Sequence, residues 1–108
     1  MKLTDLAPRF MKCLDEEHHM KEVPFAEAQG IMFDCPGCRK KYGQDGPEKY
    51  GVHSILIWFD GKGVTPDWTP TPRWTVSGTG FEDLSTTPSI LVHGCWHGYI
   101  TKGEITFC

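Results

Sequence analysis

The feature that most constrains this chain is a pair of cysteines, Cys35 and Cys38, separated by Pro36 and Gly37. Proline and glycine favour a tight turn at this point. Such a turn holds both thiolates on one side, where they can reach a single tetrahedral zinc ion at about 2.3 Å. Two thiolates make half of a four-ligand set, so the fold is expected to bring two more ligands to this turn.

The remaining ligands are predicted near the end of the chain and at residue 53. Cys95 and His97 are two residues apart, so in an extended strand their side chains leave the same face. With the turn they complete a Cys3His set for Zn²⁺. His53 competes for the fourth position, because it begins a strand soon after the turn.

The choice between these histidines decides what kind of site this is. Four protein ligands close a structural site, whereas three ligands and a water leave a catalytic one. If His97 binds the ion, His53 becomes a candidate acid/base residue, and the sequence alone leaves both arrangements open. Ser89 is a second catalytic candidate near the metal, although the segment Thr87-Pro88-Ser89 is equally typical of a turn that starts a strand.

The number of cysteines argues against a disulfide framework. There are 5, an odd number, and the first residues, MKLTDLAPRFMK, lack the apolar stretch of a secretory signal. A cytosolic location and metal binding are therefore expected. Two alternatives for the cysteine pair are buried core residues and a redox dithiol. The second is disfavoured because the motif is expected to precede a loop rather than to open a helix.

The fold is predicted to be mostly β, or α+β, with a small antiparallel sheet around the zinc site. Glycine (12) and proline (8) are frequent, and no long stretch repeats an apolar face every three to four residues. A length of 108 residues fits one domain, 1–108, with a less defined section at 1–29 and a core at 30–108.

Alternating and apolar runs predict the individual strands. The clearest is 53–59, which is apolar on both faces and is therefore expected to be a central strand. Residues 39–51 and 60–73 are expected to be loops. Further strands are predicted at 9–14, 30–34 and 74–77, and from residue 86 a strand, a glycine break and a hairpin that turns at Lys102 and Gly103.

The charge balance bears on the partners. The formal net charge of -3 disfavours general affinity for nucleic acid, and Arg39, Lys40 and Lys41 make only a small basic cluster. No stretch is long and apolar enough for a membrane span. Neither a phosphate loop, nor a dinucleotide fingerprint, nor a His-Glu-x-x-His motif is present. Neither general nucleic-acid binding nor a membrane-spanning role is therefore expected.

From Gln29 to the end, the chain resembles a family of small zinc-binding proteins of tailed phages and prophages, which often carry the label "ammonia monooxygenase" without a chemical reason for it. The resemblance runs through five segments in one order: GIMFDCPGC at 30–38, HSILIWF at 53–59, RWTVSGTG at 73–80, LSTTPSIL at 84–91 and GCWHGYITKGEI at 94–105.

The resemblance implies a zinc-binding fold and an activity. The family's signature positions fall on Cys35, Cys38, His53, the segment 87–89, Cys95 and His97. Related domains occur in bacterial operons for ubiquitin-like conjugation, where they look like metal-dependent peptidases. The function that the resemblance implies is thus a zinc-dependent peptidase or other hydrolase acting on a protein, such as a ubiquitin-like one, in the cytosol of a bacterial host. The alternative is a non-catalytic module with structural zinc that binds a host or phage protein.

Overall fold

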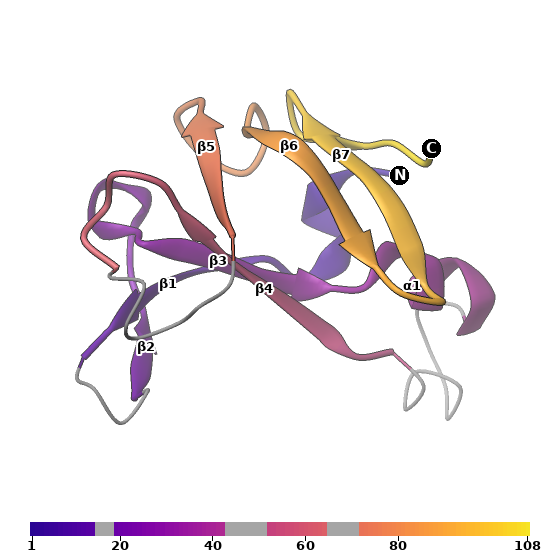
Figure 1. The fold of residues 1–108 in the computed structure, drawn as a ribbon, viewed down its shortest axis with the longest axis horizontal. Coiled ribbons are helices and arrows are strands. Elements are labelled where there is room, and N and C mark those ends of the chain that lie inside the picture. The colour runs from indigo at the N-terminus through magenta and orange to yellow at the C-terminus, as the bar shows by residue number, and fades with distance from the viewer. Residues whose placement is uncertain (15–18, 43–51, 65–71) are drawn as a thin grey trace.

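A computed structural model of the chain describes residues 1–14, 19–42, 52–64 and 72–108. Parts of two predicted loops, 43–51 and 65–71, lie outside the described residues. In the described residues, eight strands form one sheet in the order β2-β1-β3-β4-β5-β6-β7-β8 (Figure 1). The strands are β1 (Arg9–Cys13), β2 (Met20–Glu22), β3 (Gly30–Asp34), β4 (Ser54–Phe59), β5 (Arg73–Ser77), β6 (Ser85–Val92), β7 (Trp96–Thr101) and β8 (Glu104–Ile105).

The prediction of a mostly β fold is confirmed, but the sheet is mixed rather than antiparallel. Every described strand pair is antiparallel except β4 and β5, which run parallel. A parallel pair needs a crossover instead of a tight hairpin, and the long segment after β4 provides the length for it. The hairpin turn between β7 and β8 falls at Lys102 and Gly103, as expected.

The parallel junction divides the sheet into two halves of four strands each. β4 and β5 are registered at only two positions, Trp58 with Arg73 and Phe59 with Trp74. By contrast, β3 and β4 are registered at five positions, from Gly30–Trp58 to Asp34–Ser54. We call β2-β1-β3-β4 the first half-sheet and β5-β6-β7-β8 the second half-sheet. Few backbone hydrogen bonds connect them directly.

The N-terminal residues make a second connection between the half-sheets. Lys2 forms an isolated bridge with Glu104, and the Leu3 amide donates to the Gly103 carbonyl at 2.9 Å. The 3-10 helix η1 (Leu3–Leu6) that follows lies against β3. The chain therefore begins on the second half-sheet and passes directly to the first, and both chain ends lie near β7 (Figure 1).

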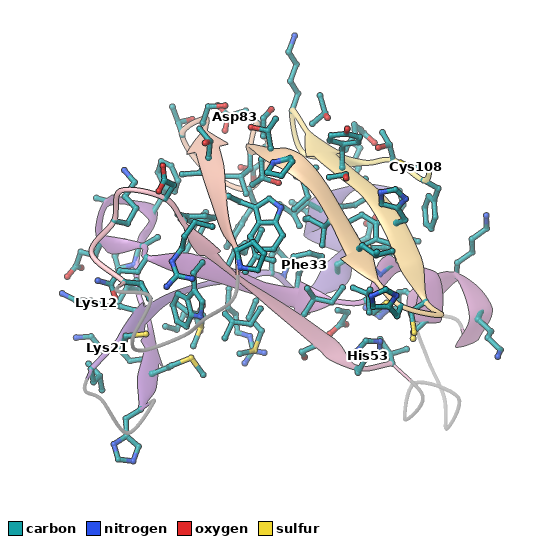
Figure 2. The ribbon with its side chains drawn as sticks, viewed as in Figure 1. Lys12, Lys21, Phe33, His53, Asp83 and Cys108 are labelled. Atoms are coloured by element: carbon teal, nitrogen blue, oxygen red, sulfur yellow. The ribbon has the colours of Figure 1, made fainter. Side chains whose placement is uncertain are left out.

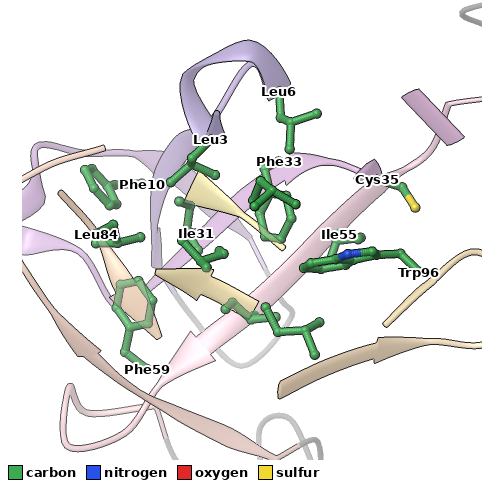
Figure 3. Packing of buried hydrophobic residues seen from close by; sticks show 14 of the residues in the cluster. Leu3, Leu6, Phe10, Ile31, Phe33, Cys35, Ile55, Phe59, Leu84 and Trp96 are labelled. Atoms are coloured by element: carbon green, nitrogen blue, oxygen red, sulfur yellow. The ribbon is translucent and has the colours of Figure 1, made fainter. Parts of the chain in front are cut away.

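One hydrophobic cluster fills the space enclosed by these elements (Figure 3). Phe33 and Ile57 come from the first half-sheet, whereas Ile100 comes from β7 and Leu84 from the connection between β5 and β6 in the second half-sheet. β7 alternates strictly, so that Trp96, Gly98 and Ile100 are buried while His97, Tyr99 and Thr101 face outward. β4 buries side chains on both faces, including Ile57 and Trp58, which confirms that it is a central strand.

Residues 36–42 correct the prediction of a loop after the cysteine pair. They form the helix α1 (Pro36–Tyr42), so the motif does open a helix. Proline is well suited to the first position of a helix, and the Arg39-Lys40-Lys41 run consists of good helix formers placed in the last turn, where positive charge is favourable. In the described part of the chain, no helix has the length and apolar character needed to span a membrane.

The burial pattern predicts unequal effects for the same substitution at two leucines. Leu84 is 0% exposed in the core, whereas Leu91 is 55% exposed on β6. Leu84→Ala should lower the free energy of unfolding by about 2–5 kcal/mol, because it leaves a cavity. Leu91→Ala, the matched control, should change it by about 0.5 kcal/mol or less. Urea denaturation of both variants measures the difference, and equal effects would contradict the assigned core.

Candidate metal centre

Four potential metal ligands converge where the two half-sheets meet α1. The sulfur atoms of three cysteines and a ring nitrogen of one histidine all lie within 4.8 Å of one another. The residues of this ligand group are Cys35, Cys38, His53 and Cys95. Three separate segments of the chain thus contribute to one potential site.

The β3–β4 ladder positions Cys35 and His53 together. The last registered pair of that ladder is Asp34 with Ser54, and one step further the Cys35 amide donates to the His53 carbonyl at 2.8 Å. The Cys35 carbonyl in turn accepts the Arg39 amide at 2.9 Å, which starts α1. The end of the ladder therefore fixes one ligand on each strand and also starts the helix that carries Cys38.

Cys95 reaches the group from the tip of the β6–β7 hairpin. Its amide donates to the Val92 carbonyl at 2.9 Å, and Gly94 takes a φ of +77°, which suits glycine. The hairpin tip rests on α1 at Gly37, where a Cβ atom would overlap the backbone carbonyl of Cys95. The glycine in the cysteine pair is therefore needed for close approach of the second half-sheet as well as for the turn.

The sulfur spacing fits a tetrahedral ion. The Sγ atoms of Cys38 and Cys95 are 3.8 Å apart. Two thiolates at about 2.3 Å from a tetrahedral zinc are separated by about 3.8 Å, whereas a disulfide requires about 2.0 Å. All three cysteines of the group are free thiols. Their arrangement is thus that of two ligands on one edge of a coordination tetrahedron.

The ligand group has a buried side and a solvent side. Cys35 is 0% exposed and Cys38 is 8% exposed, and Figure 3 shows Cys35 at the margin of the core. His53 and Cys95 are exposed, and Figure 2 shows His53 near the hairpin tip and α1. An ion held here is anchored in the core while its outer ligands face water.

The electrostatics of the thiols argue against an independent redox dithiol. Burial raises the pKa of the Cys35 thiol to about 11, and a hydrogen bond with Cys38 is the main cause of a raised pKa at Cys95. A reactive dithiol needs a lowered pKa, so the electrostatics point away from it even though the motif opens a helix. A metal cation would have to displace these protons, and its affinity should therefore rise with pH.

His97 lies outside the ligand group, although its spacing from Cys95 made it the first choice for the fourth ligand. Its Nε2 atom is 3.1 Å from the Ser89 hydroxyl, and its side chain is on the exposed face of β7. Cys95 precedes β7 in the hairpin turn, so the strand alternation that would align it with His97 does not extend to it.

Ser89 lies in the interior of β6 rather than at its start. The β6–β7 register shifts between Thr86 and Ile90, so the Thr87-Pro88-Ser89 segment forms an irregularity in the ladder. Proline has no amide hydrogen to donate to a neighbouring strand, so it is tolerated where the ladder hydrogen bonding is interrupted. The two catalytic candidates thus separate: His53 belongs to the ligand group, and Ser89 pairs with His97.

Comparisons with protein-family models, with curated proteins and with solved structures find no match for this chain.

The contact at Gly37 predicts that a single methyl group will weaken metal binding. Gly37→Ala should lower the affinity for a divalent cation by about 10–100-fold, because it pushes Cys95 away from the other ligands. Titration with Co²⁺, followed through its thiolate charge-transfer absorption, measures this change. Gly80→Ala is the matched control, since a Cβ there meets nothing closer than a Glu82 oxygen at 3.7 Å. Equal affinities for both variants would contradict the role of Gly37.

Proposed function

We propose that this chain is a zinc-stabilised β domain in which Cys35, Cys38, His53 and Cys95 hold one structural zinc ion, and that its surface binds a protein partner. The observation that carries the proposal is the complete four-ligand group, assembled within 4.8 Å from three chain segments. When bound, zinc supplies a crosslink between these segments.

The donor chemistry favours zinc over other common cations. Three thiolates and one imidazole form a soft set with no carboxylate, whereas magnesium and calcium require oxygen ligands. Tetrahedral Cys3His is a common structural zinc set, and the Cys38–Cys95 sulfur distance of 3.8 Å matches one of its edges.

The position of the group supports a structural role. Cys35, Cys38 and His53 follow or precede strands of the first half-sheet, whereas Cys95 belongs to the second half-sheet. An ion bound by all four joins the half-sheets at a distance from the two-position junction of β4 and β5. Since a domain of about 100 residues is only marginally stable, a crosslink at this place has a large effect on folding.

Several features support a protein partner rather than catalysis or nucleic-acid binding. Three thiolates donate charge to the ion and so reduce its strength as a Lewis acid. Leu91 and His97 are register partners on the outer face of the β6–β7 hairpin, and the 40% exposed Tyr99 lies on the same face. An exposed leucine and an exposed tyrosine beside a histidine are residues of the kind that protein-binding surfaces often present.

The basic cluster beside the cysteine pair is engaged within the molecule. Arg39 lies 3.4 Å from an Asp34 carboxylate oxygen and donates to the Asp5 carbonyl at 3.1 Å. The Lys40 ammonium sits 4.9 Å from the centre of the Phe107 ring. These contacts use the cations to hold α1 in place, and a phosphate backbone would have to compete for them.

The resemblance to the phage and prophage family adds a biological setting to the proposal. It supports zinc as the metal and suggests that the partner is a host or phage protein in the bacterial cytosol.

A zinc-dependent hydrolase acting on a protein, such as a ubiquitin-like one, is the second candidate. It is favoured by the solvent side of the ligand group, where His53 and Cys95 are exposed. If His53 left the ion, water could take its place, and His53 would then be positioned to move a proton.

Substituting each of the two histidines in turn distinguishes the structural-zinc module from the zinc-dependent hydrolase. His53→Ala should lower zinc affinity by more than about 100-fold, since loss of a ligand exceeds the cost of losing a supporting contact. It should also destabilise the domain. His97→Ala should leave both zinc content and stability unchanged, because His97 contacts Ser89 instead. Elemental analysis and urea denaturation of the two purified variants make the comparison.

A different outcome would favour the second candidate. If His53→Ala retains one zinc ion at unchanged affinity and remains folded, three cysteines suffice to hold the metal. The fourth position is then open, and peptidase assays on ubiquitin-like substrates become the appropriate next step.

A further inference from the structure

We propose that Cys95 is an oxidation site, at which a peroxide drives formation of a Cys38–Cys95 disulfide and loss of the metal. This inference rests on the proposed zinc site and adds a form of regulation to it. It is carried by the exposure of Cys95 together with the position of a second thiol beside it.

Access selects Cys95 as the first sulfur to react. Within the ligand group it is the exposed cysteine, at the tip of the β6–β7 hairpin, whereas Cys35 and Cys38 are 0% and 8% exposed. A metal-bound cysteine is already a thiolate, which is the nucleophilic form. Cys95 therefore combines accessibility with nucleophilic character, and the two buried cysteines lack the first of these.

Geometry selects Cys38 as its partner. The two sulfurs are 3.8 Å apart, and a disulfide requires them to approach to about 2.0 Å. The space around the hairpin tip is open at the neighbouring Gly94, where a Cβ would meet nothing within 4 Å. Because the hairpin tip already rests on α1 at Gly37, rotation of the Cys38 and Cys95 side chains must close the remaining gap of about 1.8 Å between the sulfurs.

The reaction proceeds in two balanced steps. The Cys95 thiolate attacks one oxygen of hydrogen peroxide, the O–O bond breaks, and a sulfenic acid and hydroxide form. The Cys38 thiolate then attacks the Cys95 sulfur, the S–O bond breaks, and a second hydroxide leaves. The two sulfurs lose two electrons in total, the peroxide gains them, and two solvent protons convert the hydroxides to water.

The product exchanges one crosslink for another. The disulfide removes two of the three thiolates, and Cys35 with His53 cannot complete a tetrahedral set. The metal is lost, but Cys38 and Cys95 still join the first half-sheet to the second half-sheet through a covalent bond. The oxidised domain is thus expected to stay folded while its hairpin tip and α1 change position around the former site.

The test uses the zinc-loaded full chain treated with hydrogen peroxide. Released zinc is measured with a colorimetric chelator, and disulfides are mapped by mass spectrometry of non-reduced peptides. We expect one zinc released per chain together with one Cys38–Cys95 disulfide, and recovery of zinc binding after a phosphine reductant. Cys108→Ser is the matched control, because Cys108 is exposed but outside the ligand group, and it should release zinc as the unmodified chain does.

The alternative outcomes are distinct. A chain that binds zinc but keeps it under peroxide, or that releases it with a Cys35–Cys38 disulfide or with sulfinic acid at Cys95, overturns this inference and leaves the zinc proposal intact. A chain that binds no zinc before peroxide is added overturns the proposed function, and the inference with it.

Discussion

The hairpin tip of the second half-sheet can rest on α1 only because residue 37 is glycine. At this contact the backbone carbonyl of Cys95 occupies the space that any side chain at residue 37 would need. The contact brings the Cys95 sulfur to 3.8 Å from that of Cys38. The ligand group therefore depends on this approach of two backbones.

The rest of the fold explains why a crosslink at this point matters. The half-sheets share a hydrophobic cluster and the N-terminal residues, but their direct strand pairing covers only two positions. Burial of apolar side chains is non-directional, so it favours contact between the halves without fixing their relative position. Four directional metal–ligand bonds in the proposed site would supply that precision where the cysteine turn and the hairpin tip meet.

Much of this arrangement could be predicted from the sequence. The strands at Gly30–Asp34 and Ser54–Phe59 have strong apolar patterns, and the cysteine pair with its turn residues predicts a potential metal site. The apolar patterns and the turn residues act within a few residues of the chain, so these predictions required no knowledge of tertiary contacts. The prediction of Cys35, Cys38 and Cys95 as neighbours agrees with the structure.

Other features depend on contacts that local patterns do not contain. The helix α1 was missed because Gly37 and the polar residues after it suggested a loop, whereas docking against the hairpin tip stabilises a short helix. His97 was preferred to His53 on strand alternation, but Cys95 lies in a turn, where alternation does not apply. The pairing of Asp34 with Ser54 would have pointed to His53, since it puts residues 35 and 53 side by side.

The most direct test of the central claim is X-ray absorption spectroscopy at the zinc edge of the purified, zinc-loaded protein. We predict three sulfur ligands at about 2.3 Å and one nitrogen at about 2.0–2.1 Å, with the imidazole scattering pattern of a bound histidine. A site with two sulfurs, or with three sulfurs and a water oxygen in place of the histidine, would contradict the closed, structural centre proposed for this chain.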